Sequence, residues 1–310
     1  MNFPDHLTSL IYLKSKLQKW KNIALFFAIF SILLTFKLIF GTGIKNDVID
    51  SNYIANIKIE GAIFRNDYRS KILKEIAEQK NIRALIINID SPGGEIVGSE
   101  ILFNEIRKIA EKKPTVVVMN SVAASGAYMS AVASDYIIAH NGTLTGSIGV
   151  LMESPEITDL ANKIGIKFNT YKSSPLKGSP SLFEKNNPKV EKIMQESIID
   201  SYQFFVELVK NRRVNKLNKN MLNEIFDGRV FTGRQALKAG LVDKIGNFQD
   251  ALDYLLLQKI DFKQIPIRDV DVIEKENNFF DKLLGYLPFS NNKNSNFFDK
   301  KIMAVMPWFK

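Results

Sequence analysis

The residues with the clearest chemical potential lie between Asn120 and Val150, in the stretch NSVAASGAYMSAVASDYIIAHNGTLTGSIGV. An apolar run at 115–119 predicts a buried strand, and a loop of small residues carrying Ser125 separates it from a helical stretch at 126–133. Many α/β enzymes place an exposed nucleophilic serine at such a strand-to-helix turn. The N-terminus of the helix would offer backbone N–H groups to a developing negative charge. The same pattern also fits a turn whose small residues serve only packing.

A nucleophilic serine needs a base that removes its proton. The chain has only two histidines, His6 and His140; the first precedes a long apolar segment, and the second ends an apolar run, where a structural or surface histidine is the commoner case. A lysine is therefore the favoured base, and it must be neutral, which requires burial that lowers a lysine pKa. Lys177 has no acidic neighbour in sequence closer than Glu184. Spacing alone does not distinguish it from the other lysines.

Two further loops follow predicted strands and could contribute to the same site. The first is DSPGG at 90–94, where the N–H of Gly93, together with that of Gly126, could form an oxyanion hole. The second is TLTGSIGV at 143–150, where the hydroxyl of Ser147 could hydrogen-bond a catalytic amine. Open α/β sheets place their sites at the carboxyl ends of strands. Each loop, taken alone, fits an ordinary glycine turn equally well.

The segments around these loops alternate between strand and helix patterns. Strands at 54–59, 84–89 and 115–119, with helices at 68–76 and 95–110 between them, are the βαβ signature of an α/β fold with a parallel sheet. Beyond residue 150 the pattern is less regular. It predicts a helix at 155–164 capped by Ser154, a strand at 168–171, a turn-rich loop at 172–180 and a long helix from Pro188 to about residue 212. Shorter helices are predicted at 218–226 and 233–239, the second ended by Gly240, and they are followed by a segment at 248–258 that closes the domain and an alternating segment at 265–272.

Composition narrows the class of protein. The chain has 310 residues, 45% of them hydrophobic, which is enough for a substantial core and excludes a disordered chain. It has no cysteine, which excludes disulfides, thiolate nucleophiles and cysteine-ligated zinc. The net charge of +9 comes from scattered lysines rather than a basic stripe, so we expect no nucleic-acid partner.

Residues 23–40 are almost continuously apolar and predict one transmembrane helix. Lysines precede this segment and acidic residues follow it, which predicts a cytoplasmic N-terminus and an extracytoplasmic C-terminal portion (Lys14, Lys16, Lys19 and Lys21 before; Asp47 and Asp50 after). The alternative is a cleaved signal peptide with its cleavage site near residues 41–43. The apolar core is longer and starts later than in a signal peptide, so an anchor is favoured.

Five motifs occur in order along the chain: SPGG at 91–94, AASGAY at 123–128, GTLTGSIGV at 142–150, SPLKGSP at 174–180, and DGRVFTGRQALKAGLVDKIG at 227–246. Together they resemble the signal peptide peptidase family SppA in its short bacterial form. The similarity runs from about Tyr53 to Leu255, and the predicted anchor also fits that family.

The resemblance implies a ClpP/crotonase-like α/β fold and a serine nucleophile with a lysine general base. It implies the following roles: Ser125 as nucleophile, Lys177 as base, Ser147 as the residue that orients the lysine, and Gly93 and Gly126 as oxyanion donors. Because the lysine loop varies within the family, Lys172 is the alternative base. One residue departs from the pattern: Ala127 stands where the family usually has glycine, and its methyl group could narrow the substrate groove.

The resemblance also implies an enzyme that acts on peptides at a membrane. We expect a serine endopeptidase without metal or cofactor, acting on remnant signal peptides and similar short apolar peptides. It would reside in the bacterial inner membrane with its catalytic domain outside the cytoplasm, as a homo-oligomeric ring in which Ser125 of one protomer meets Lys177 of the next. The expected division is a basic arm at 1–22, the anchor at 23–40, a linker at 41–52, the peptidase domain at 53–258, and a tail at 259–310.

Two other functions remain open on the sequence alone. A crotonase-type acyl-CoA enzyme would share the fold and use paired oxyanion N–H groups on a thioester, although the anchor and the Ser/Lys pair argue against it. A non-catalytic membrane scaffold could also retain the fold. The tail is compatible with a membrane-surface segment, an intersubunit arm or disorder.

Overall fold

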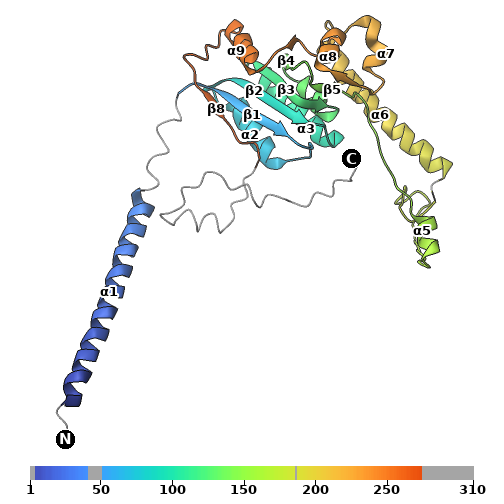
Figure 1. Cartoon of the computed structure of the whole chain (residues 1–310). Coiled ribbons are helices and arrows are strands. Elements are labelled where there is room, and N and C mark those ends of the chain that lie inside the picture. Colours follow the sequence, from blue (N-terminus) through green and yellow to red (C-terminus); the bar gives the residue numbers. More distant parts are fainter. Residues whose placement is uncertain (1–3, 41–50, 186, 274–310) are drawn as a thin grey trace.

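The computed structural model describes residues 4–40, 51–185 and 187–273 (Figure 1). The first element is the long helix α1 (Pro4–Phe40). It includes a stretch, Leu13–Thr35, that is long and apolar enough to cross a membrane and is not buried against the rest of the chain. The helix therefore begins well before the predicted span, and the basic segment that precedes the span is helical from Pro4 onward.

Most of the remaining chain is built around one mixed sheet. Along the main path the strand order is β6-β5-β3-β2-β1-β8; β4 pairs with β3, and β7 pairs with β4. All pairings are parallel except that of β5 with β6. The strands are β1 (Tyr53–Glu60), β2 (Ile82–Ser91), β3 (Thr115–Ala124), β4 (Tyr136–Ala139), β5 (Leu144–Gly146), β6 (Val230–Thr232), β7 (Lys244–Ile245) and β8 (Ile267–Asp269).

Helices cover both faces of the sheet. One face packs against the crossover helices α2 (Asp67–Glu78) and α3 (Ile96–Ala110), together with the short helix α4 (Gly126–Ala131). The other face packs against α9 (Phe248–Leu257). Side chains of β2 alternate between the two: Leu85 and Ile87 face the first cluster, and Ala84 and Ile86 face the second. The predicted α/β fold with repeated βαβ units is confirmed.

Strand β3 is longer than the sequence pattern predicts. Its apolar run ends at Met119, but the strand continues to Ala124. The first half of β3 pairs with β4, and its last residues, 122–124, pair with β5 on the same side. The continuous strand therefore ends directly at Ser125, which places this residue at the carboxyl edge of the sheet.

A second long helix, α6 (Pro188–Arg213), is anchored only by its C-terminal half. Phe205 and Val209 are buried there, and Arg212 donates to the carbonyl oxygens of Val132 and Ser134 just beyond α4, at 2.9 and 3.0 Å. Most side chains of its N-terminal half are exposed. In Figure 1 this half leads away from the sheet toward α5 (Thr158–Lys163).

A buried ion pair completes the anchoring of α6. Arg213 binds both carboxylate oxygens of Asp243 at 2.9 Å and also donates to the carbonyl of Gly240. Burial by itself raises the pKa of Asp243, but the charge and hydrogen bonds of Arg213, with a hydrogen bond from Lys216, hold that pKa below its usual range. Between α6 and β7 lie a 3-10 turn, Lys219–Met221, and the helices α7 (Leu222–Ile225) and α8 (Gly233–Ala239).

Two predictions for the region after residue 150 are wrong. The helix there begins at Thr158 rather than 155, and Ile157 rather than Ser154 occupies the position before its first turn. Residues 168–171 form no strand, since no neighbouring strand pairs with them. Gly240 does end α8 in the left-handed conformation, with φ of 79°. The predicted tail lies, from residue 274 onward, outside the described residues.

Candidate active site

Ser125 occupies a sharply turned position between β3 and α4. Its backbone has φ of 54° and ψ of −124°, a conformation that costs free energy for any residue other than glycine. The turn is held at both ends: the Ser125 N–H donates to the carbonyl of Gly146, and its carbonyl accepts from the N–H of Met129, both at 2.9 Å. Such strain fits a serine whose side chain is presented at the edge of the sheet. Ser125 is half-buried there.

The loop after β2 lies directly against this turn. Ser91 pairs with Ala123 across the sheet, so the glycines that follow Ser91 run beside Ser125. Gly93 has φ of 104°, and a Cβ atom there would lie 2.8 Å from the nitrogen of Gly126 and 3.0 Å from the Cβ of Ser125. The structure therefore brings Gly93, Ser125 and Gly126 together, as the sequence predicts.

The two candidate oxyanion donors, the N–H groups of Gly126 and Gly93, differ in the hydrogen bonds they make within the chain. Gly126 is the first residue of α4, and the first N–H groups of a helix have no acceptor within the helix. The N–H of Gly93 donates to Oγ of the fully buried Ser91 at 3.1 Å, and its carbonyl accepts from the N–H of Ile63 at 2.8 Å. For Gly93 to donate to an oxyanion, this N–H must be shared with Ser91 or released from it.

Ser147 also lies at this edge of the sheet. Ala124 and Gly146 are a register pair of the parallel strands β3 and β5, and Ser125 and Ser147 are the residues that come next on each strand. Ser147 has φ of 50°, and its N–H donates to the carbonyl of Arg229 at 2.9 Å. Ser125 and Ser147 therefore lie next to each other at this edge of the sheet, as the sequence predicts.

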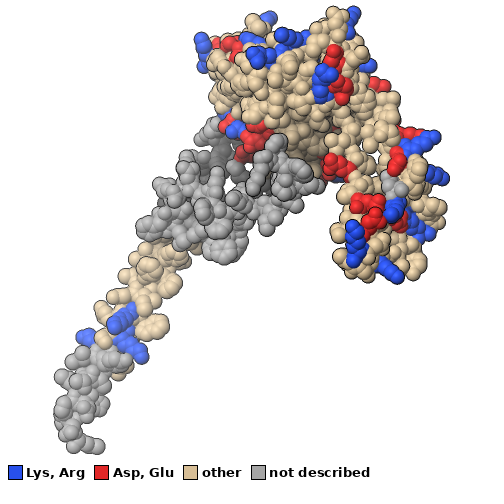
Figure 2. Space-filling model, turned by 45° about the vertical axis from the view of Figure 1, so that its right-hand side comes forward, with Lys and Arg blue, Asp and Glu red and all other residues tan. Residues whose placement is uncertain are grey.

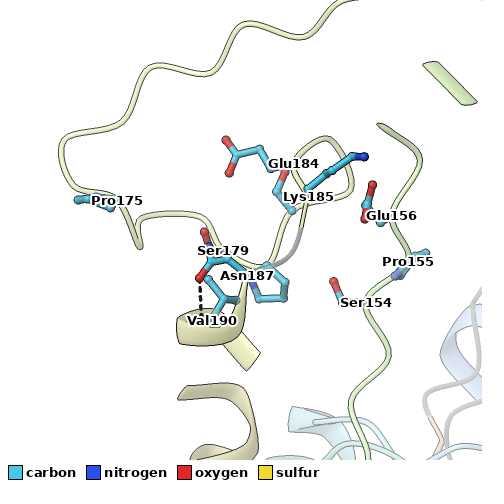
Figure 3. A pocket seen from close by; sticks show the side chains of 11 residues that line it. Ser154, Pro155, Glu156, Pro175, Ser179, Glu184, Lys185, Asn187 and Val190 are labelled. Carbon is cyan, nitrogen blue, oxygen red and sulfur yellow. Dashed lines mark hydrogen bonds between the residues drawn. The ribbon is translucent and has the colours of Figure 1, made fainter. Parts of the chain in front are cut away.

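The segment that carries Lys177 lies elsewhere. We refer to residues 151–187 as the lysine arm. Pro175 and Ser179, on either side of Lys177, line a pocket together with Asn187, the residue that caps the N-terminus of α6 (Figure 3). Figure 2 shows this end of the molecule as a lobe that projects from the α/β body and carries side chains of both charges. Within one chain, Lys177 sits at the far end of α6 and Ser125 at the edge of the sheet.

The two candidate lysines differ in their surroundings. Lys177 is exposed, and none of the ion pairs among the described residues involves it. Lys172 is largely buried; its Nζ forms an ion pair with Glu184 and lies 3.3 Å from Oγ of Ser179. A lysine that acts as a base needs burial without a carboxylate partner. Within one chain neither lysine meets both conditions, so their surroundings do not select the base.

Other ionisable groups are poorly placed to act on Ser125. Met119 of β3 pairs with Ala139 of β4, and His140 directly follows Ala139, so His140 lies beside Asn120 of β3. Five residues of extended strand, about 17 Å, separate that level from Ser125. Burial raises the pKa of Tyr128, whose hydroxyl donates to a backbone carbonyl at 2.9 Å, so this phenol stays neutral. Among the described residues, no group of three or more His, Cys, Asp or Glu could hold a metal ion.

Two buried residues near Ser125 were missed by the sequence analysis. Ser99 on α3 is fully buried, and its Oγ, without a hydrogen-bond partner among the described residues, lies 2.1 Å from where a Cβ of Gly126 would be. Ser91 holds Gly93 as described above. No sequence signal separates either serine from an ordinary core serine. Ala127 is also fully buried and belongs to the core, so its methyl group packs inward rather than narrowing a groove, contrary to the prediction.

Comparison with known proteins identifies the family. A model of peptidase family S49 matches residues 107–259. A Synechocystis sp. protein named "Putative protease" is 38% identical over 200 residues, which cover 64% of this chain and 71% of that protein. This chain belongs to peptidase family S49. It is accordingly a serine peptidase, and the serine turn described above lies within the matched residues.

Two further similarities were found for this S49 peptidase. An Enterococcus faecium protein named "Putative signal peptide peptidase SppA" is 36% identical over 206 residues, covering 66% of this chain and 58% of that protein. This chain thus spans less than two thirds of that relative. Among solved structures, a point mutant of ClpP1 from Listeria monocytogenes aligns with a TM-score of 0.42 at 18% identity, covering 66% of this chain and 95% of that chain.

The close approach of Gly93 to the Ser125 turn gives a direct test of the site. Gly93→Ala should abolish most peptidase activity while the domain stays folded, because its Cβ would push against backbone atoms 2.8 and 2.9 Å away. Gly142→Ala is the matched control, since a Cβ there meets nothing within 4 Å. Activity and melting temperature should be measured on both variants. Normal activity of Gly93→Ala would remove this glycine from the site.

Proposed function

We propose that this S49 peptidase is a membrane-anchored serine endopeptidase in which Ser125 is the nucleophile and Lys177 the general base. The observation that carries the proposal is the strained turn at Ser125, which presents a serine at the edge of the sheet against Gly93 and Gly126. This is the arrangement that acyl transfer requires: a nucleophile beside two backbone donors.

The reaction would proceed in two steps. Neutral Lys177 takes the proton of the Ser125 hydroxyl while Oγ attacks the peptide carbonyl, and the N–H groups of Gly93 and Gly126 stabilise the resulting oxyanion. The protonated lysine then gives its proton to the departing amine, which leaves an acyl ester on Ser125. Water hydrolyses this ester with the lysine again acting as base. Ser147, beside Ser125, would hold the lysine amine in place.

The separation of Ser125 from Lys177 within one chain supports a site shared between protomers. Because the base must lie within hydrogen-bond reach of the nucleophile, another copy of the chain would have to supply the lysine. The lysine arm is suited to contact another copy, since it exposes an unusual number of large apolar side chains: Leu151, Met152, Leu160, Ile164, Ile166, Phe168 and Tyr171. Repeated head-to-tail contacts of this kind can close into the expected ring.

The substrates would be short, extended and apolar. Remnant signal peptides are the class that the name of the Enterococcus relative suggests. A ring would also keep folded proteins away from its catalytic serines. A crotonase-type acyl-CoA enzyme gains no support from the described site, and a non-catalytic scaffold would have no need of the strained serine.

Covalent labelling tests the nucleophile and the base separately. A fluorophosphonate should label Ser125, identified by peptide mass spectrometry, and Ser125→Ala should abolish the labelling. Lys177→Ala should lower both labelling and peptide hydrolysis by several orders of magnitude, since loss of a base from such a pair is that costly. Lys172→Ala is the matched control and should retain most activity. The reverse result for the two lysines would make Lys172 the base, and labelling elsewhere would refute the role of Ser125.

The orientation of the anchor is a further part of the proposal. We propose that α1 crosses the bacterial inner membrane once through residues 23–40 and leaves the catalytic domain outside the cytoplasm, because lysines gather before this segment. A reporter that is active only outside the cytoplasm should be active when fused after Asp50 and inactive when fused at residue 1. The opposite pattern would overturn this orientation.

A further inference from the structure

A buried serine of α3 lies directly against the candidate oxyanion donor Gly126. Ser99 is 0% exposed, and its Oγ lies 2.1 Å from the point where a Cβ of Gly126 would stand. The next nearest atoms to that point are the Cβ of Ser99 at 3.0 Å and the nitrogen of Gly94 at 3.3 Å. The hydroxyl of Ser99 therefore fills the space in which a side chain of residue 126 would begin.

This hydroxyl adds no hydrogen bond to the described part of the fold. The Oγ of Ser99 has no hydrogen-bond partner among the described residues. A buried hydroxyl without a partner lowers stability, whereas an alanine at the same place would bury no polar group. Stability alone therefore gives no reason for a serine here, and an unpaired buried group of this kind calls for another explanation. Its contact with Gly126 offers one.

A second buried serine holds the opposite side of Gly126. The Oγ of Ser130, which is also 0% exposed, donates to the carbonyl of Gly126 at 2.9 Å and lies 3.5 Å from the carbonyl oxygen of Ser99. The nitrogen of Gly126 faces the loop after β2, where a Cβ on Gly93 would lie 2.8 Å away. Gly126 is thus enclosed by atoms of α3, of α4 and of the loop that carries Gly93.

This enclosure bears on the N–H of Gly126. A glycine backbone can adopt more conformations than that of any other residue. An oxyanion donor is effective only if it already points to the place where the negative charge develops. Because the Ser99 hydroxyl fills the space beside the Cα of Gly126, this residue cannot shift into that space, and the direction of its N–H is fixed.

We propose that Ser99 is a positioning residue of this peptidase: its hydroxyl packs against Gly126 and holds the Gly126 N–H in the direction that the oxyanion requires. Ser130 supports the same glycine through its carbonyl. The inference rests on the proposed function, in which Ser125 is the nucleophile and Gly126 a donor. Ser99 itself touches neither the substrate nor the reacting atoms and acts only through Gly126.

The variant Ser99→Ala in the full chain tests this role, with a fluorogenic amide of a short apolar peptide as substrate. Its kcat should fall roughly tenfold, because complete removal of one oxyanion donor costs about 10²–10³ in kcat and a misdirected donor costs less. KM should stay within about twofold of wild type, since ground-state binding does not use the donor. The melting temperature should stay the same or rise, because an unpaired buried hydroxyl is removed.

Ser134→Ala is the matched control. Ser134 lies just beyond α4 and is 4% exposed, and its Oγ donates to the carbonyl of Ala131 at 2.7 Å. This variant also removes a buried hydroxyl near α4, but one that makes a hydrogen bond and does not contact Gly126. It should therefore lower the melting temperature and leave kcat unchanged, which is the opposite of the pattern expected for Ser99→Ala.

A pair of inhibitors separates positioning from a general loosening of the site. A peptide trifluoromethyl ketone adds the serine oxygen and forms an oxyanion, whereas the corresponding peptide alcohol cannot. In Ser99→Ala, the affinity for the ketone should fall by about the same factor as kcat/KM, and the affinity for the alcohol should not change. A loosened site would weaken the binding of both compounds.

A double variant tests the contact itself. Gly126→Ala alone should be nearly inactive, because its Cβ would lie 2.1 Å from the Oγ of Ser99. When Ser99→Ala is added, the nearest remaining atoms are 3.0 and 3.3 Å away, and the new methyl group fills the vacated space. The double variant should therefore have a kcat at least severalfold above that of Gly126→Ala.

Four outcomes would overturn the inference: wild-type kcat in Ser99→Ala, a clear drop in its melting temperature, equal loss of affinity for the ketone and the alcohol, or a double variant as inactive as Gly126→Ala. Fluorophosphonate labelling of the wild-type chain distinguishes this failure from failure of the proposed function. If Ser125 is labelled while Ser99→Ala is fully active, only the role of Ser99 is refuted. If Ser125 is not labelled, the proposed nucleophile and the role of Ser99 are both refuted.

Discussion

The site depends on one packing constraint, the close approach of two backbone segments at the carboxyl edge of the sheet. The chain after β2 passes so near the turn after β3 that a Cβ atom on Gly93 would lie 2.8 Å from the nitrogen of Gly126. The glycines leave room for this approach, and the pairing of β3 with β2 and β5 holds it in place. The strained backbone of Ser125 is maintained because both neighbouring strands fix its position.

The long helix α6 explains why the lysine is remote from this turn. Its C-terminal half is fixed to the core through Phe205, Arg212 and the buried pair of Arg213 with Asp243. Its N-terminal half carries the lysine arm away from the body and leaves apolar side chains exposed. One chain thus holds the proposed nucleophile and oxyanion donors at one place and the proposed base at another, which is the arrangement expected if the complete site forms between copies.

The sequence predicted the βαβ units and the cluster of Gly93, Ser125, Gly126 and Ser147, because apolar periodicity and glycine turns are local signals. The predictions failed where pairing between strands distant in sequence determines the secondary structure. Strand β3 extends past Met119 because β5 pairs with its last residues, 122–124, and residues 168–171 form no strand because none pairs with them. The buried roles of Ser91 and Ser99 carry no local signal. Lys177 emerged only from family resemblance, since its proposed partner lies on another copy.

The central claim is that Ser125 of one protomer works with Lys177 of another, and mixing two inactive variants tests it most directly. Ser125→Ala and Lys177→Ala chains should each be inactive alone. Co-assembled in equal amounts, they should recover about a quarter of the wild-type activity, because that share of head-to-tail contacts pairs an intact serine with an intact lysine. No recovery, in assemblies that native mass spectrometry shows to contain both variants, would contradict a shared site.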